Sequence, residues 1–108
     1  MIYLASPYSH RSVEVRDQRF RQACVAAGKL MKQGHVVFSP IAHTHPIAEL
    51  VDLPKDWAFW ARQDLFFLSE SDRLVVLRLA GWQESRGVRA EIKYAEDQGI
   101  PVEYMDAE

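Results

Sequence analysis

Residues 73–105, RLVVLRLAGWQESRGVRAEIKYAEDQGIPVEYM, carry the pattern of a strand, a helix and a second strand. The apolar run RLVVLRL at 73–79 predicts a buried strand, and VEYM at 102–105 predicts another. A helix is expected between them, and it ends at Gly99, a residue type that commonly terminates helices. Alternation of this kind with short connections is typical of a parallel sheet covered by helices.

Towards the N-terminus the chain repeats this alternation, so the expected order is β-α-β-α-β-α-β. The other expected elements are a strand at 2–5, a helix at 11–33, a strand at 35–39, a long loop at 40–55 and a helix that opens at Pro54-Lys55-Asp56, with Asp56 as N-cap, and runs to about Ser69. The expected fold class is α/β, a three-layer Rossmann- or flavodoxin-like fold whose mostly parallel sheet of four to five strands is flanked by helices. In such folds the ligand binds beyond the carboxyl ends of the strands.

Length and composition limit the classes of protein to consider. The chain has 108 residues, of which 48% are apolar and 26% charged, so we expect one folded domain over residues 1–108. The net charge of −2 provides no basic excess, which argues against a nucleic-acid polymer as partner. With neither a signal peptide nor an apolar run of about 20 residues, a cytoplasmic protein without a membrane partner is expected.

The helix at 11–33 is expected to bury one apolar face. That face is assigned to Phe20, Ala23, Cys24, Ala27, Leu30 and Met31. Cys24 is the one cysteine of the chain, so no internal disulfide is possible, and burial is favoured over a role as nucleophile.

Two carboxylates occupy inward-facing positions of predicted helices. Glu91 shares a helical face with Val88 and Ala95, and Asp64 lies four residues before Leu68 on another apolar face. A buried carboxylate is costly unless it is paired or hydrogen-bonded, so two of them on successive helices suggest a shared polar pocket. The alternatives are a helix edge that reaches solvent, or an ion pair with one of three arginines, Arg16, Arg62 and Arg78.

The turn before the last helix has the composition of an anion site. Ser85 and Gly87 would place a hydroxyl and backbone N–H groups at the start of that helix, where anions are attracted. Ser6, just after the first strand, is a second candidate for contact with a phosphate. Alternatively, Ser85 is an ordinary N-cap and Ser6 a turn residue before Pro7.

Histidines and tryptophans complete the candidate set. His43 and His45 resemble the start of a metal site, but no third ligand is evident, so contact with substrate or a neighbouring subunit is favoured and no metal is expected. Trp57, Trp60 and Trp82 are expected mostly in the core or at its rim; Trp60 and Trp82 are assigned as candidates to cover a flat heterocycle. Neither a Walker loop nor GxGxxG is present, so no cofactor is expected.

Nearly the whole chain resembles the superfamily of nucleoside 2-deoxyribosyltransferases and their nucleotide N-glycosidase relatives, with its closest likeness to a small bacterial branch. The likeness starts at IYLASPYS and continues through GHVVFSPI and SESDRLVVL to SRGVRAEIKYAEDQGIPV. Its most specific part is Ser-x-Gly-Val-x-x-Glu followed by Gly-x-Pro-Val. The resemblance implies an N-glycosidase or deoxyribosyltransferase that cleaves the base–sugar bond of a nucleoside 5′-monophosphate-like substrate. The alternative is a noncatalytic nucleotide or nucleotide-sugar binding domain on the same fold.

The same resemblance implies roles for individual residues. Glu91 matches the nucleophile that attacks the anomeric carbon, and Tyr3 matches a residue that helps to position it. Asp64 matches a residue that contacts base or sugar, and it is the candidate acid for the leaving base. Ser6 and Ser85 match residues that hold a 5′-phosphate, whereas transferases on free nucleosides tend to carry Asp in place of Ser85. We expect the helix N-terminus to keep Glu91 ionised.

Related enzymes are oligomers whose subunits complete each other's pockets, so a homodimer or homotetramer that binds a small-molecule nucleotide or nucleoside is expected. Phe59, Phe66 and Phe67 fall largely off the inner face of their helix and would form an apolar surface for the partner. The segment 40–55 departs from the family pattern, and it bears on the identity of the substrate. A metal hydrolase built on the two histidines of this segment would need a carboxylate within reach of both.

Overall fold

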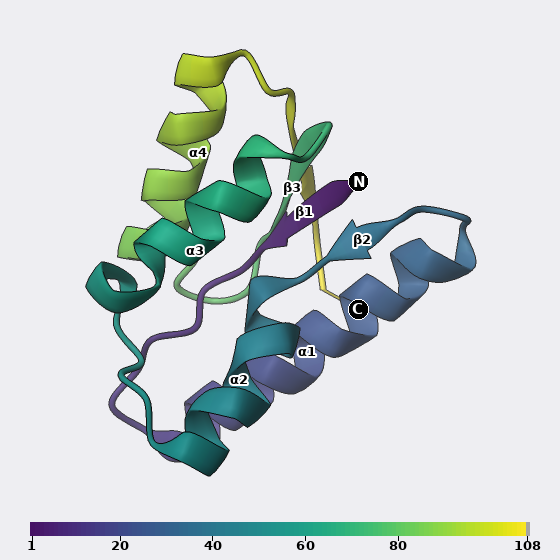
Figure 1. Ribbon diagram of the computed structural model, residues 1–108. Coiled ribbons are helices and arrows are strands. Elements are labelled where there is room, and N and C mark those ends of the chain that lie inside the picture. The colour runs from purple at the N-terminus through teal and green to yellow at the C-terminus, as the bar shows by residue number, and fades with distance from the viewer. Residues whose placement is uncertain (108) are drawn as a thin grey trace.

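A four-stranded parallel sheet in the order β2-β1-β3-β4 forms the centre of the computed structural model, which describes residues 1–107 (Figure 1). Along the chain the elements are β1 (Ile2–Ala5), α1 (Val13–Lys32), β2 (Val37–Phe38), α2 (Pro40–Val51), α3 (Trp57–Ser69), β3 (Arg73–Leu77), α4 (Arg86–Gln98) and β4 (Val102–Met105). The expected α/β fold of Rossmann or flavodoxin type is confirmed, and all four strands are parallel.

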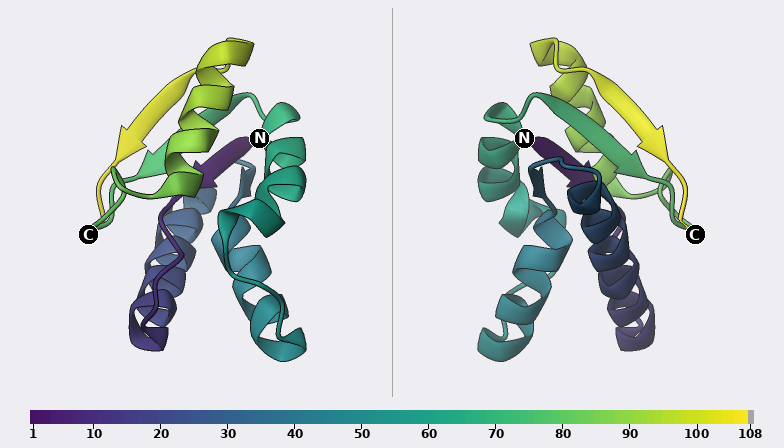
Figure 2. Two further views of the ribbon diagram at one scale, coloured as in Figure 1. Left: turned by 90° about the vertical axis from the view of Figure 1, so that its left-hand side faces the viewer. Right: turned by 90° about the vertical axis from the view of Figure 1, so that its right-hand side faces the viewer.

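Helices cover both faces of the sheet, which gives three layers (Figure 2). Successive residues of β1 point to opposite faces. Leu4 packs with Ala27 of α1 on one face. Tyr3 packs with Leu68 of α3 and Val88 of α4 on the other. Because both faces are buried, the central strands are apolar at nearly every position, as their sequences predicted.

The sheet order creates a crevice at the carboxyl end of β1. This strand lies between β2 and β3, so the chain leaves it toward one neighbour and later returns to the other. The loop after β1, the start of α2 and the turn after β3 all follow the carboxyl ends of strands. Ligands bind at such a reversal of strand order in open α/β sheets.

The prediction of a long loop at 40–55 is wrong, because most of this segment is the helix α2. The Ser39 hydroxyl accepts a hydrogen bond from the Ala42 N–H at 3.2 Å and caps the helix. Pro40 occupies the first helical position, where its missing N–H has no intrahelical partner to lose. Pro46 lies inside the helix, a position that normally opposes helix formation, but packing against α1 buries His45 and Ala48 and offsets that penalty.

The face that α1 buries is narrower than expected. It consists of Ala23, Ala26 and Ala27, at i, i+3 and i+4. Cys24 and Met31 lie to one side of this stripe and are exposed, so their predicted burial is wrong. The neighbouring β2 spans two residues rather than the expected 35–39.

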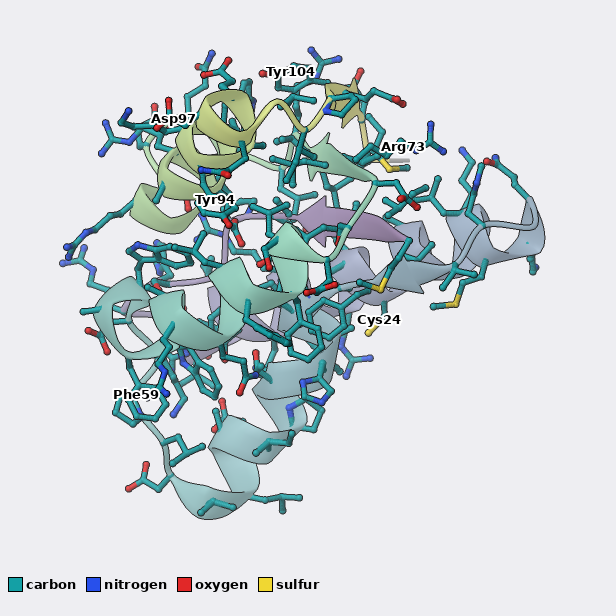
Figure 3. All side chains as sticks on the ribbon, turned by 45° about the horizontal axis from the view of Figure 1, so that its top comes forward. Cys24, Phe59, Arg73, Tyr94, Asp97 and Tyr104 are labelled. Atoms are coloured by element: carbon teal, nitrogen blue, oxygen red, sulfur yellow. The ribbon has the colours of Figure 1, made fainter. Side chains whose placement is uncertain are left out.

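The aromatic residues of α3 divide between surface and core. Phe59 and Phe66 are 47% and 61% exposed, and Figure 3 shows Phe59 pointing outward from the helix. Phe67 was also expected on the outside, but its ring stacks on Phe38 at 4.2 Å between centroids. The outward apolar surface of α3 is therefore smaller than predicted. Within residues 1–107, no helix combines the length and the apolar character that crossing a membrane requires.

Candidate active site

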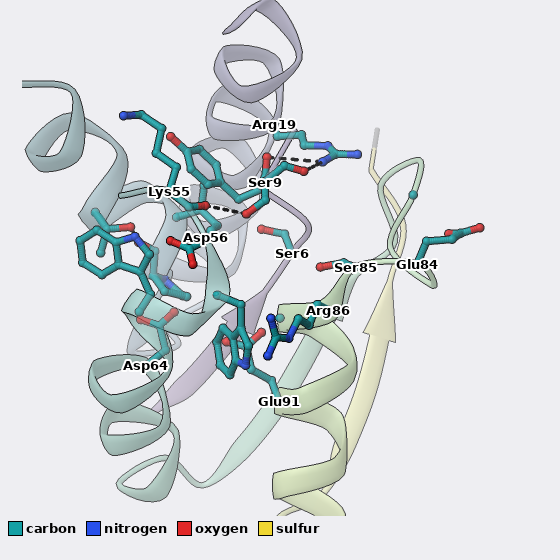
Figure 4. Close-up of a pocket in the computed structure, with 18 residues that line it drawn as sticks. Ser6, Ser9, Arg19, Lys55, Asp56, Asp64, Glu84, Ser85, Arg86 and Glu91 are labelled. Carbon is teal, nitrogen blue, oxygen red and sulfur yellow. Dashed lines mark hydrogen bonds between the residues drawn. The ribbon is translucent and has the colours of Figure 1, made fainter. Parts of the chain in front are cut away.

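A cavity of about 420 Å³ lies at the carboxyl edge of the sheet (Figure 4). Its walls are the loop after β1, the beginnings of α2 and α3, and the turn into α4. The predicted site residues that line it are Ser6, Trp60, Asp64, Ser85, Gly87 and Glu91. Residues brought together from separate segments of the chain thus form one site.

Glu91 is the most deeply buried carboxyl group of the cavity, with 4% of the residue exposed. The Tyr3 hydroxyl, from the central strand β1, donates a hydrogen bond to Glu91 Oε2. Burial raises the pKa of Glu91 to about 8, while the Tyr3 hydrogen bond lowers it and the charge of Asp64 raises it. Burial thus favours the protonated form of this side chain in the free protein.

The expectation that the helix N-terminus keeps Glu91 ionised is wrong. Since α4 begins at Arg86, Glu91 is its sixth residue and lies beyond the first turn, where the helix dipole acts. Desolvation dominates its pKa instead. The same desolvation acts on Tyr3, which is fully buried beneath the cavity and whose pKa is raised well above its usual value.

Asp64 is the second buried carboxyl group, and 6% of the residue is exposed. Its Oδ1 atom has no hydrogen-bond partner among residues 1–107. Burial raises the pKa of Asp64 to about 7. The alternative of an arginine pair does not hold for Glu91, which is bonded to a tyrosine, and Arg78 pairs instead with Asp106 at 2.8 Å.

The start of α4 forms one wall of the cavity. Ser85 is the N-cap, and its hydroxyl oxygen accepts from the Val88 N–H at 3.2 Å, so the cap interpretation is correct. The Ser85 hydroxyl also lines the cavity and can still donate a hydrogen bond. A Cβ added to Gly87 would lie 3.1 Å from the Trp57 ring, so glycine allows α3 and α4 to approach closely.

Ser6, which follows the end of β1, also lines the cavity. The residue is 5% exposed, and its Oγ has no hydrogen-bond partner among residues 1–107. Buried hydroxyl groups are normally hydrogen-bonded. An unpartnered hydroxyl on a cavity wall is therefore a position where a ligand can complete the hydrogen bonding.

Neither histidine lines the cavity. Both belong to α2, where residues i and i+2 face different directions, so the two rings have different neighbours. His43 packs against Phe38, with 5.6 Å between ring centroids. His45 Nδ1 is hydrogen-bonded to Tyr8 Oη at 2.5 Å, and its Nε2 lies 3.1 Å from Asp17 Oδ1. Asp17, His45 and Glu49 have donor atoms within 4.8 Å of one another, but His43 does not share this cluster. The pair does not converge on a common metal.

Two of the three tryptophans line the cavity, and the third does not. Trp60 lines the cavity, and its indole N–H donates to the Pro54 carbonyl oxygen at 2.7 Å, which fixes the ring. Trp82 does not line the cavity; it packs with Tyr104 at 5.6 Å between centroids. Trp57, which we did not assign to the substrate, is a wall residue.

Sequence reasoning assigned none of the charged residues of the rim to the site; they are Arg19, Lys55, Asp56, Glu84 and Arg86. Arg19 lies within α1 and the others lie in turns or at helix starts; the apolar periodicity of a helix or strand gives no signal for charged residues of this kind. Asp56 was expected to cap α3; it occupies the N-cap position, but its side chain makes no capping hydrogen bond. Figure 4 shows its carboxylate among the side chains that surround the cavity.

Polar contacts hold the rim together. The Arg19 guanidinium donates to the carbonyl oxygens of Ser9 at 3.0 Å and Ala80 at 3.1 Å, which joins the loop after β1 to the turn after β3. The Ser9 hydroxyl donates to the Lys55 carbonyl oxygen at 2.6 Å, which joins the same loop to the segment before α3. The walls are thus fixed relative to one another by hydrogen bonds as well as by the core.

Comparison with protein families identifies this chain with a known domain. The family model described as "Domain of unknown function (DUF1937)" matches residues 1–107, so the chain belongs to that family. No curated protein matches the chain.

Proposed function

We propose that this DUF1937 domain cleaves the N-glycosidic bond of a nucleoside 5′-monophosphate-like substrate, with Glu91 as nucleophile. The observation that carries the proposal is the buried Glu91 carboxyl at a cavity, hydrogen-bonded by Tyr3 and close enough to Asp64 for the two charges to interact. Enzymes that cleave glycosidic bonds typically use a pair of carboxyl groups. The sequence resemblance to deoxyribosyltransferases and nucleotide N-glycosidases points to the same chemistry.

In this reaction a Glu91 carboxylate oxygen attacks the anomeric carbon as the bond from that carbon to the base nitrogen breaks. The electron pair of the broken bond goes to the base, and protonated Asp64 supplies a proton to the leaving nitrogen. The product is a glycosyl ester on Glu91. Water then attacks the ester and gives hydrolysis, or a second base attacks and gives transfer; the ionised Asp64 accepts the proton of the incoming group.

The protonation states required are an ionised Glu91 and a protonated Asp64. Burial gives Asp64 a pKa of about 7, so a large fraction of it carries the proton at neutral pH. Glu91, with a pKa of about 8, must lose its proton as the substrate binds. Positive charge that develops at the anomeric carbon favours the carboxylate, as does the Tyr3 hydrogen bond.

The remaining wall residues fit a phosphorylated ligand with a flat base. The Ser6 hydroxyl, the Ser85 hydroxyl and the backbone N–H groups at Gly87 offer donors to a phosphate at the start of α4. The fixed indole of Trp60 offers a flat apolar surface to the base. We propose further that the protein is cytoplasmic and works as a homodimer or homotetramer.

A noncatalytic nucleotide-binding domain is the second candidate, and the raised pKa of Glu91 favours it. A carboxyl that stays protonated would only donate and accept hydrogen bonds. The bonding of Glu91 to a tyrosine rather than to an arginine and its position on an open cavity favour the enzyme instead.

The deciding experiment is a screen of nucleosides and nucleoside 5′-monophosphates for base release, with Glu91→Gln as the test variant. The substituted amide keeps the shape of the side chain but lacks the charge, so turnover should fall by orders of magnitude while substrate binding survives. Glu96→Gln, on the exposed side of the same helix, is the matched control and should behave as the wild type. Near-normal turnover by Glu91→Gln on a confirmed substrate would exclude this mechanism.

A further inference from the structure

Arg86 is a cavity residue to which the proposed reaction assigns no role. It is the first residue of α4, and Figure 4 shows its side chain reaching from the start of that helix toward the cavity. We propose that Arg86 determines the selectivity of the site for phosphorylated ligands by binding the phosphate together with Ser6 and Ser85. That the rest of the ligand is a nucleoside rests on the proposed function.

The position of Arg86 is electrostatically unusual. The start of a helix carries partial positive charge and favours acidic side chains. The first turn of α4 holds no acidic residue, and Arg86 adds a full positive charge at its first position. This arrangement is unfavourable by itself and becomes favourable when an anion binds between the helix end and the guanidinium.

The other cations of the cavity wall already have protein partners. The Arg19 guanidinium donates to the carbonyl oxygens of Tyr8, Ser9 and Ala80. Lys55 Nζ donates to the Leu53 carbonyl oxygen at 3.2 Å. Within the described part of the chain, the side chain of Arg86 has neither a hydrogen bond nor an ion pair. Its five N–H donors are therefore available to a ligand.

The buried Ser6 hydroxyl is independent evidence for a ligand at this place. It comes from the end of β1 rather than from α4, lines the same cavity and lacks a partner within residues 1–107. A hydroxyl, a capping serine and a guanidinium that line one cavity from two elements offer donors to the three terminal oxygens of a phosphate monoester. An uncharged hydroxymethyl group of a nucleoside would leave the guanidinium unpaired.

Inorganic phosphate is the probe, because it tests the anion site without a substrate. Its affinity is measured by titration calorimetry at low, constant ionic strength for the wild type, Arg86→Gln and Arg89→Gln. Arg89 is the matched control, since it lies exposed on the same helix but does not line the cavity. Arg86→Gln should weaken phosphate binding about 10- to 100-fold, because a charge-assisted contact is lost. Arg89→Gln should change it less than about threefold, as expected for an exposed charge.

Thermal unfolding separates this effect from damage to the fold. Phosphate should raise the melting temperature of the wild type and of Arg89→Gln, but hardly that of Arg86→Gln. Without phosphate, Arg86→Gln should melt at the same or a higher temperature than the wild type, because a cation is removed from the start of a helix. Equal phosphate affinity for the two arginine variants, or no phosphate binding by the wild type, would overturn the inference.

The assay of base release distinguishes this inference from the proposed function. Arg86→Gln should raise the KM for a 5′-monophosphate and leave the unphosphorylated nucleoside unaffected. An equal loss with both substrates would refute selectivity through Arg86, although the glycosidase function would stand. Phosphate binding that depends on Arg86, in a protein that releases no base, would sustain the inference and count against the glycosidase.

Discussion

Tyr3 and Glu91 are 88 residues apart in the sequence, and the hydrogen bond between their side chains links the central strand to α4 beneath the cavity. Because Tyr3 is fully buried, its hydroxyl cannot bond to solvent, and the hydrogen bond to Glu91 fixes the orientation of the hydroxyl. The strand thereby determines where the carboxyl group of the helix lies.

Tyr3→Phe removes this hydrogen bond while keeping the ring in the core. We expect kcat for base release to fall about 10- to 100-fold, since a hydrogen bond to a charged group is lost, with little change in KM. The bond lowers the pKa of Glu91, so the variant should also need a higher pH to reach its maximal rate. A pH–rate profile identical to that of the wild type would show that Tyr3 has only a packing role.

The raised pKa of Glu91 makes stability depend on pH. Above its ordinary pKa of 4.5 an unfolded Glu91 loses its proton, whereas the folded one keeps it until about pH 8. Stability from this group is therefore fully present below pH 4.5, declines as the pH rises, and is lost above about pH 8. The slope is at most about 1.4 kcal/mol per pH unit for one proton.

Glu91→Gln carries no such proton, so its melting temperature should fall less than that of the wild type between about pH 5 and about pH 8. Melting curves by circular dichroism at several pH values test this, with Glu96→Gln as the exposed control. Parallel curves for wild type and Glu91→Gln would mean that the buried carboxyl is not protonated in the folded protein.

Ser85 should affect both stability and phosphate binding. Ser85→Ala removes the cap of α4 and should lower the free energy of unfolding by about 1 kcal/mol. It also removes a donor to the phosphate, so the affinity for a 5′-monophosphate should fall about 10- to 150-fold. Ser85→Thr keeps the hydroxyl and is the control. Equal loss of nucleoside and nucleotide binding in Ser85→Ala would leave Ser85 with the capping role alone.

The exposed face of α3 should form a contact between subunits. Phe59 and Phe66 lie seven residues apart, on one side of the helix, and both are largely exposed. We expect a dimer or tetramer by light scattering at micromolar concentration, and a monomer after Phe59→Ser and Phe66→Ser are combined. A monomeric mass for the wild type would contradict the prediction; Glu96→Ser, exposed on α4 and outside this face, is a control.

The sequence could predict those parts of the protein in which apolar residues recur at the spacing of a helix or a strand. The central strands β1 and β3 and the inward positions of Glu91 and Asp64 follow from strand and helical spacing, and they lie where that spacing puts them. The helix α2 was missed because its two prolines suggest a loop. The Ser39 cap and the burial of its inner face stabilise the helix nonetheless.

Other features depended on contacts between distant segments. Nothing in the spacing of His43 and His45 shows that one packs on Phe38 and the other bonds to Tyr8 and Asp17. Trp82 likewise does not line the cavity, and its contact with Tyr104 on β4 could not be seen in the spacing either. Rim residues such as Arg86 need the cavity itself before a role for them can be argued.

Gly87 has a consequence for the spacing of the two carboxyl groups. Asp64 belongs to α3 and Glu91 to α4, so the separation of the two carboxyl groups depends on how closely these two helices pack. A methyl group at position 87 would lie 3.1 Å from the Trp57 ring at the start of α3, so that ring would have to give way by a few tenths of an ångström. The spacing between the proposed acid and the proposed nucleophile is thus sensitive to a residue that has no side chain and no place in the proposed reaction.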